Sequence, residues 1–320
     1  MGDDIPVINM ADSDYLLKLA EDHMEAGRFA EAIPLLLHLR DLHRGEDSYV
    51  MKLAWAYHDN GQLAEALACL EELFEKEVSR RIFTGFAFDE LVRIYKRENM
   101  TDRLVAICER AVAAQPDDFA LLGDLAEAYL KAEMAAEAVS VFQRMIALDP
   151  RESVVYCRMG DALIALDDEE GAERAYEKAI SLDPQDTGLY YSRLADAFLK
   201  ADRLASAERA IRKGIAFDDT KPAFHLALGD ILLAGGDTEG AFSAYEEAVR
   251  LFEGAAGAYY QRLGNSLMKK SLPAEACRAF RLAVAAEPAN PLYLLRLAEA
   301  YLADGLYEEA QEALRRAQNL

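Results

Sequence analysis

The chain has 320 residues, of which 52% are apolar and only nine are proline, so it can bury a large core and is not a disordered polypeptide. Its 57 acidic and 35 basic residues leave a formal net charge of −22, which disfavours nucleic acid and anionic membrane surfaces as partners. No apolar run approaches the roughly 20 residues that cross a bilayer. Four scattered cysteines without a Cys-x-x-Cys pair are typical of a reducing compartment, so we expect a cytoplasmic protein without membrane insertion.

A small residue recurs within an apolar stripe at intervals of 34 to 38 residues along the chain. We call these residues the anchors, and they are Ala20, Ala54, Val92, Ala126, Gly160, Ala195, Gly229, Gly264 and Ala298. A second small residue follows twelve places after each anchor, with Leu104 as the exception. A period this regular predicts a tandem array of similar units.

Each unit is predicted to be a helix, a turn and a second helix. Apolar residues at three- and four-residue spacing, such as Leu122, Leu125 and Tyr129, predict the first helix, and a later stripe such as Ala172 and Tyr176 predicts the second. No stretch alternates with period two for long enough to be a strand, so the expected fold class is all-α. After an N-terminal segment, 1–12, the nine units span about 13–46, 47–84, 85–118, 119–152, 153–187, 188–221, 222–256, 257–290 and 291–320.

Two units carry the fullest pattern. The fifth has Tyr156, Met159, Gly160, Leu163, Ala172, Tyr176, Ala179 and Pro184. The eighth has Tyr260, Leu263, Gly264, Leu267, Ala276, Phe280, Ala283 and Pro288. This pattern resembles the tetratricopeptide repeat, W-x2-L-G-x2-Y…A-x3-F…P. The resemblance covers residues 13–320 and implies one right-handed superhelical solenoid rather than separable domains.

The third unit departs most from the pattern. Val92 occupies the anchor, Leu104 replaces alanine and Cys108 replaces the aromatic residue. A four-residue insertion near Arg81–Thr84 precedes it. These departures predict irregular helix packing at this place.

Motifs for catalysis and for cofactors are missing from the sequence. It has no P-loop, no strand-borne G-x-G-x-x-G, no H-E-x-x-H and no G-x-S-x-G. His38 and His43 are five residues apart and do not share a helix face, so they do not suggest a metal site. We therefore expect no enzymatic activity, no cofactor and no metal.

Polar columns mark a candidate binding surface. Residues two before, one after and five after each anchor point away from the core, and the resemblance implies that the first helices line the concave groove. One after the anchor stand mainly acids, including Glu127, Asp161, Asp196 and Asp230, and two before it mainly bases, including Lys52, Arg158, Arg193 and Arg262. One interpretation is a ladder that grips an extended peptide. The other is pairing within single helices, as in Arg158 with Asp161, Arg193 with Asp196, Arg296 with Glu299 and Asp196 with Lys200.

Trp55, the only tryptophan, interrupts the acidic column. Lys52 and His58 are next to Trp55, and the following unit offers Arg93, Lys96 and Arg97. A tryptophan beside arginines has the composition of a binding hot spot. The alternative is that residues Ile5–Met10 fold back over Trp55, while Asp59 and Glu90 neutralise the arginines.

The resemblance implies a non-catalytic scaffold or adaptor that binds a protein or an extended peptide segment in its groove. One alternative is a regulatory receptor that tightens around a small peptide or an anionic ligand, which solution scattering would reveal as compaction. A weaker alternative is the substrate-recognition array of an enzyme such as a glycosyltransferase, which would co-purify with a catalytic subunit. A receptor for chaperone tails is disfavoured, because no lysine stands three places before any anchor.

Overall fold

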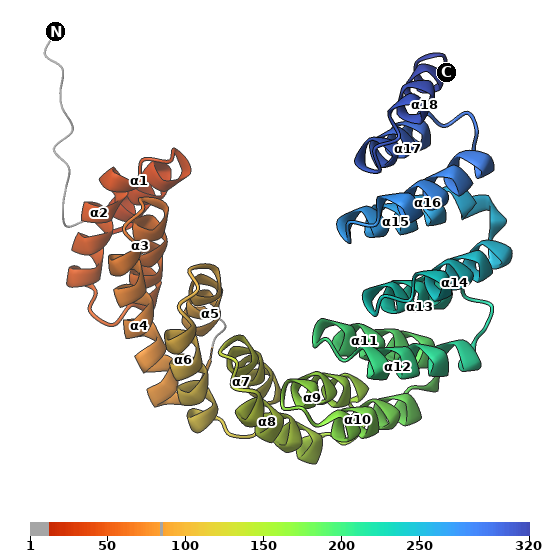
Figure 1. The fold of residues 1–320 in the computed structure, drawn as a ribbon. Helices are drawn as coiled ribbons and strands as arrows, with labels where there is room; N and C mark the ends of the chain where they lie inside the picture. The colour runs from red at the N-terminus through yellow and green to blue at the C-terminus, as the bar shows by residue number, and fades with distance from the viewer. Residues whose placement is uncertain (1–12, 84–85) are drawn as a thin grey trace, which may run out of the picture. The chain divides into compact units, whose positions relative to one another are not determined.

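The structure is a computed structural model that describes residues 13–83 and 86–320, and all its regular elements in those ranges are helices (Figure 1). The helices of the first four repeats are α1 (Ser13–Glu25), α2 (Phe29–Leu42), α3 (Asp47–Asp59), α4 (Leu63–Arg80), α5 (Ala87–Arg97), α6 (Thr101–Ala114), α7 (Phe119–Lys131) and α8 (Ala135–Leu148). The later ones are α9 (Ser153–Ala165), α10 (Glu169–Leu182), α11 (Thr187–Lys200), α12 (Leu204–Phe217), α13 (Pro222–Ala234), α14 (Thr238–Leu251), α15 (Ala256–Lys269), α16 (Pro273–Ala286), α17 (Pro291–Ala303) and α18 (Tyr307–Gln318), with 3₁₀ turns η1 (Pro184–Asp186) and η2 (Glu253–Ala255). The predicted fold class, an all-α solenoid of helix-turn-helix repeats, is confirmed.

The turn inside each repeat is set by one residue with a left-handed backbone. These residues are Gly27, Gly61, Asn99, Glu133, Asp167, Asp202, Gly236, Ser271 and Gly305. The amide three places past the end of the first helix then donates back to it, as from Arg28 to the carbonyl of His23 at 2.8 Å. This closure ends a helix with its last carbonyls satisfied and sends the chain back antiparallel.

Glycine anchors let aromatic rings of the second helix approach the first. A Cβ atom at Gly229 would lie 2.6 Å from the ring of Tyr245, and one at Gly160 would lie 2.7 Å from the ring of Tyr176. Both distances are shorter than a van der Waals contact, so any side chain here would force the helices apart. The repeat pattern therefore pairs glycine at the anchor with a large ring sixteen residues later.

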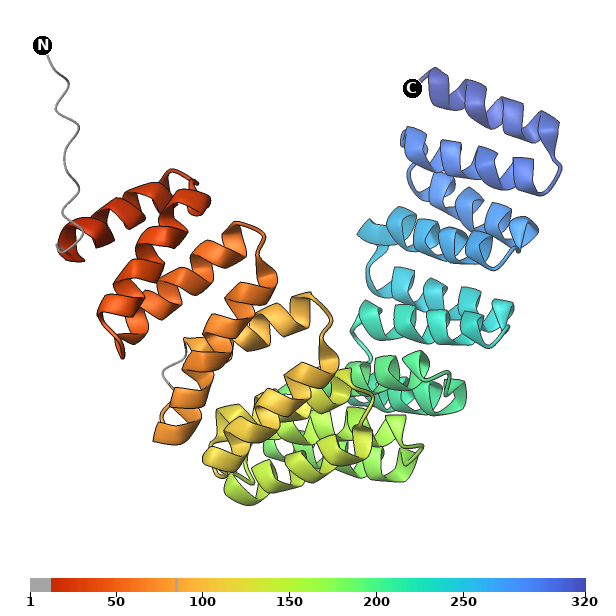
Figure 2. The ribbon, with the colours of Figure 1, turned by 90° about the vertical axis from the view of Figure 1, so that its left-hand side faces the viewer.

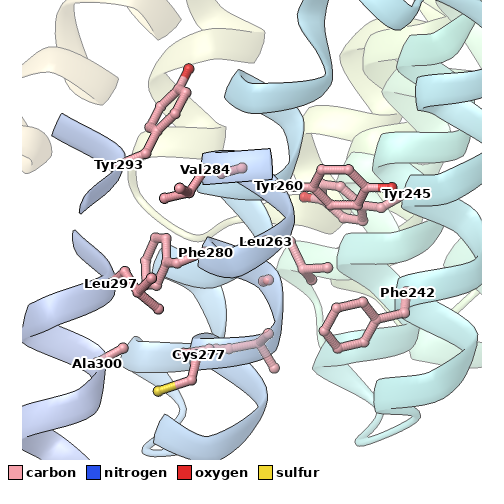
Figure 3. Packing of buried hydrophobic residues seen from close by; sticks show 14 of the residues in the cluster. Phe242, Tyr245, Tyr260, Leu263, Cys277, Phe280, Val284, Tyr293, Leu297 and Ala300 are labelled. Carbon is pink, nitrogen blue, oxygen red and sulfur yellow. The ribbon is translucent and has the colours of Figure 1, made fainter. Parts of the chain in front are cut away.

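Two compact units divide the chain between Leu148 and Asp149. Neighbouring helices within each unit lie side by side in both views (Figures 1 and 2). In the second unit, Phe280 on α16 is buried between α15 and α17, near Leu263 and Leu297 (Figure 3). Each unit thus buries a continuous core between successive helices, as expected of stacked repeats. That all nine repeats form one array stays a prediction.

The irregular third repeat is nevertheless packed. Helix α4 has 18 residues, four or five more than the other helices of the first unit outside the short α5, so it absorbs most of the predicted insertion as one more helical turn. Leu104 and Cys108 are fully buried. The ring of Phe83 then packs against Phe74 at 6.2 Å and Phe88 at 5.8 Å between centroids. These positions are buried, but α5 and α6 contact each other less than the two helices of any other repeat, so the irregular helix packing predicted here is borne out. Thr84 lies outside the described residues.

Within residues 13–83 and 86–320, no helix is long and apolar enough to cross a membrane. The same ranges hold no group of three or more His, Cys, Asp or Glu side chains that could bind a metal ion.

Candidate functional site

Asp161 on α9 joins two neighbouring repeats. It accepts a hydrogen bond from the hydroxyl of Tyr176 at 2.5 Å and another from Nη2 of Arg193, on α11, at 2.7 Å. Burial and then the Asp161 carboxylate raise the pKa of Tyr176 far above its ordinary value, so the phenol stays protonated and donates. One carboxylate therefore holds the second helix of its own repeat and the first helix of the next.

Asp230 on α13 makes the same arrangement two repeats later. The hydroxyl of Tyr245 donates to it at 2.6 Å, and Nη2 of Arg262 on α15 donates to its other oxygen. Burial again is the main cause that raises the pKa of Tyr245. These two Tyr–Asp–Arg clusters use four of the predicted ligand-binding residues for contacts between repeats.

A common register explains these bridges. In each, an acid one place after an anchor meets a base two places before the next anchor, and Lys52 with Glu21 at 2.7 Å follows the same rule. Asp196 lacks a partner in this register because Ala227 stands where the base would be. Asp196 is exposed and makes no ion pair or hydrogen bond with any residue that the structure describes.

The interpretation as pairs within one helix holds for Arg296 with Glu299, at 2.7 Å. It is wrong for Arg193, whose guanidinium reaches across to Asp161 instead. Arg158, which is half-buried, forms no ion pair within the second unit. The columns thus contain both residues that hold repeats together and residues left open to a partner.

In the first unit, the basic residues near Trp55 also have acidic neighbours. Lys96 on α5 binds Glu127 on α7 at 3.0 Å. Arg93 forms two hydrogen bonds with Glu90 of its own helix. This agrees with the alternative that acidic residues neutralise the arginines near Trp55. These contacts lower the pKa of Glu90.

His58 bridges α3 and α5. Nη2 of Arg97 lies 2.7 Å from Nε2 of His58, and Nδ1 of His58 lies 2.8 Å from Asp59. Because a guanidinium only donates, Nε2 must accept and Nδ1 must carry the proton toward Asp59. The structure therefore brings His58 and Arg97 together, while Asp59 contacts the histidine. Residues Ile5–Met10, the predicted cover of Trp55, lie outside the described residues.

Trp55 borders a cavity of about 490 Å³ formed by α3, α4 and the start of α5. The indole is 40% exposed, and Ile82 and Phe86, which also line the cavity, are 60% and 61% exposed. Met51 and Leu73 form its buried apolar wall. Large apolar side chains seldom gather this exposed unless they bind something.

Sequence reasoning identified Trp55 and Lys52 but missed Ile82, Phe86 and Arg80 at the same cavity. The available signal was the run Ile82-Phe83 with Phe86, three large apolar residues at the insertion. A repeat pattern has no slot for inserted residues, so it could not assign them to core or surface.

Family models place the chain among known proteins. Tetratricopeptide repeat models match residues 154–186 and residues 17–76, 106–153, 192–256 and 262–319. The chain belongs to the tetratricopeptide repeat family. The stretch 77–105, which these models do not match, covers the insertion and the first part of the irregular third repeat.

Solved structures of similar fold include MamA, at 22% identity over 52% of this chain and 90% of that one, with a TM-score of 0.37. The Cut9–Hcn1 hetero-tetramer of the APC/C matches at 16% identity over 98% of this chain and 54% of that one, with a TM-score of 0.37. YrrB, described as a tetratricopeptide protein with an unusual peptide-binding site, matches at 19% identity over 56% of this chain and 91% of that one, with a TM-score of 0.35. No curated protein sequence matches the chain.

Proposed function

We propose that this chain is a non-catalytic scaffold that binds a protein or peptide segment on the exposed face of the first helices of its repeats, the odd-numbered helices α1 to α17. The observation that carries the proposal is the exposed Trp55 beside an apolar cavity of about 490 Å³. Repeats of this family generally serve as interaction scaffolds. Tryptophan in a pocket is the residue type that most often dominates binding energy in protein interfaces.

Two polar residues also support binding at the exposed face of the first helices. Asp196 is exposed without a partner, and Arg158 is open within the second unit. An extended segment needs donors and acceptors for its backbone and its side chains, and these two groups offer one of each sign. The bridged residues Asp161, Arg193, Asp230 and Arg262 would instead keep the repeats in register.

We also propose that the protein works in the cytoplasm, with a protein or peptide as partner and without nucleic acid or cofactor. All four cysteines are free and buried. Burial raises the pKa of Cys108 and of Cys157 to about 12, so both stay protonated and unreactive. The net charge of −22 opposes binding to polyphosphates.

Site-specific photo-crosslinking tests the proposal. A photoreactive residue is placed at Arg93 or Asp196 on first helices and, as matched controls, at Glu170 or Arg174, which are exposed on the second helix α10. We expect the full chain to crosslink a protein from cell extract through the first two positions and not through the controls. Equal yields from all four positions would refute a binding face on the first helices.

A further inference from the structure

We propose that the cavity beside Trp55 is an anchor site for one large apolar side chain of the partner, and that an acidic residue adjoins this side chain in the partner segment. The proposal rests on the scaffold function and deepens it, because it assigns the chemistry of the bound segment. It concerns a place where the family pattern is interrupted, so the site belongs to this chain's own insertion.

The cavity has the size and the wall of a side-chain pocket. Its volume of about 490 Å³ lies within the roughly 300–1,000 Å³ of ligand pockets. Met51 and Leu73 close the bottom, while Trp55, Ile82 and Phe86 leave apolar surface at the mouth. A leucine, isoleucine or phenylalanine side chain would bury this surface and gain hydrophobic free energy.

The packing of the residues that follow α4 keeps the mouth of the cavity open. Helix α4 ends at Arg80, and the capping residue Arg81 has a left-handed backbone with φ 54°. The ring of Phe83 then packs at an angle against the buried rings of Phe74 and Phe88. Since Phe83 points into the core, its neighbour Ile82 stays exposed at the rim, so the pocket does not have to be formed by the ligand.

Three cations and two carboxylates line the cavity in a chain that is strongly acidic overall. The cations are Lys52, Lys76 and Arg80, and the carboxylates are Asp47 and Glu77. Glu77 is buried and accepts a hydrogen bond from the amide of Phe88 at 3.1 Å, so it faces the start of α5. Glu21 and Glu72, outside the lining, pair with Lys52 and Lys76, so the preference for a carboxylate rests on Arg80 and not on an excess of positive charge.

Among the three cations, Arg80 has the most hydrogen-bond donors without an acceptor. Its Nη1 donates to Asp47 at 2.9 Å, and its side chain is 59% exposed. Lys76 shares Asp47 and also contacts Glu72, while Lys52 is paired with Glu21. The remaining guanidinium donors of Arg80 make no contact with any described residue, and a carboxylate is the group that such donors bind best.

A partner segment with an apolar residue next to aspartate or glutamate satisfies both features. Its apolar side chain would enter between Trp55 and Phe86, and its carboxylate would bind Arg80. A segment with a basic residue in that place would set its charge against the Arg80 guanidinium and leave the spare donors of Arg80 without an acceptor. The rim thus favours acidic over basic segments.

The test is a selection of random dodecapeptides displayed on phage against the full chain. We expect enrichment of peptides with a large apolar residue beside Asp or Glu. Binding of the best synthetic peptide should shift the fluorescence of Trp55, the sole tryptophan, provided that the peptide itself lacks tryptophan. Its affinity should fall at least tenfold on Phe86→Ser and on Arg80→Gln, and Arg80→Lys should restore part of the loss.

Leu189→Ser and Arg174→Gln are matched controls, because both residues are exposed and lie in the second unit. Circular dichroism and thermal unfolding check that every variant is folded. Enrichment of basic peptides, or of none, would overturn the anchor site. So would binding that is insensitive to Phe86 and Arg80. If such peptides lose affinity on Arg158→Ala or Asp196→Ala instead, the scaffold function stands and only the anchor site fails.

One further outcome would overturn the proposal that a separate partner occupies the cavity. If the double variant Val7→Ser, Ile8→Ser shifts the emission of Trp55 without any peptide, the occupant of the cavity is the chain's own N-terminal segment. An unchanged emission supports a separate partner.

Discussion

The repeats from α9 to α16 and the junction of α4 with α5 use polar side chains in opposite ways. In the regular repeats, Asp161 and Asp230 each receive a tyrosine and an arginine, so charge is consumed in holding neighbours together. At the junction, Arg80 keeps free donors above an exposed apolar cavity. Residues of the same type thus stabilise the regular repeats and stay accessible at the irregular junction.

This difference follows from the spacing of acidic and basic residues in successive repeats. Where successive units obey one register, an acid and a base recur at a constant distance and find each other. The extra turn of α4 adds charged side chains that the repeat pattern does not pair, and Lys76 and Arg80 both share Asp47 of their own repeat. Binding surface in such an array is therefore expected where the repeat is interrupted.

The largest expected effect concerns the junction. Trp55→Ala should weaken partner binding by about 2 kcal/mol or more, roughly thirtyfold, because a hot-spot indole loses its contacts. Stability should change little, since the indole is 40% exposed. The affinity is measured by titrating each variant with the partner that photo-crosslinking identifies. Leu189→Ala in the second unit is the control, and equal losses from both variants would contradict a special role for the junction.

The next effect concerns cohesion of the regular repeats. Gly229→Ala should destabilise the protein by about 1–3 kcal/mol, because its Cβ would clash with the ring of Tyr245 at 2.6 Å. Gly123→Ala should instead stabilise by up to about 1 kcal/mol, because the nearest atom is 3.9 Å away and alanine favours helix. Denaturant unfolding followed by circular dichroism measures both. A stabilising Gly229→Ala would show that the ring does not need the glycine.

Much of the fold follows from the sequence, for reasons that are local. Small anchors, apolar stripes and turn residues such as Gly27 and Asp167 act within one repeat, and each has a single acceptable place in it. The left-handed backbones of Glu133 and Ser271 were not predictable in this way, because neither residue type favours that conformation.

The candidate site was predictable only in part. The spacing from an anchor indicates which face of its helix a residue occupies, so Asp161 and Arg193 are predicted to point away from the core, and both are half-buried. It does not show how far the next repeat lies, and the contact between these two residues spans 32 positions. Which charges are bridged and which stay open is therefore decided by packing between repeats.

A smaller effect is expected from removing one bridge. Asp161→Ala should destabilise the protein by about 1–2 kcal/mol, because the hydroxyl of Tyr176 and the guanidinium of Arg193 lose their acceptor in a partly buried place. Asp196→Ala, in the same column but unbridged, should stay within about 0.5 kcal/mol of the parent protein. Thermal and denaturant unfolding of both variants provide the comparison. Equal effects would mean that the Tyr–Asp–Arg cluster contributes no cohesion.

The smallest effect concerns the acid dependence of the junction. Burial alone would raise the pKa of Asp47, but hydrogen bonds from Lys76 and Arg80 outweigh it and lower the pKa below the ordinary 3.8. A carboxyl with a lowered pKa in the folded state stabilises that state above its ordinary pKa, and the contribution disappears as the pH falls through the lowered value.

Asp47→Asn should therefore be less stable than the parent protein near pH 6, by about 0.2–1 kcal/mol as for other exposed pairs, and the gap should close at an acid pH below the lowered pKa of Asp47. Asp196→Asn, which breaks no bridge, should show no such gap at either pH. Urea unfolding at both pH values measures the difference. A gap that persists in acid would mean that Asp47 acts as a neutral acceptor, and Arg80 would then be a weaker carboxylate ligand than its pairing with Asp47 implies.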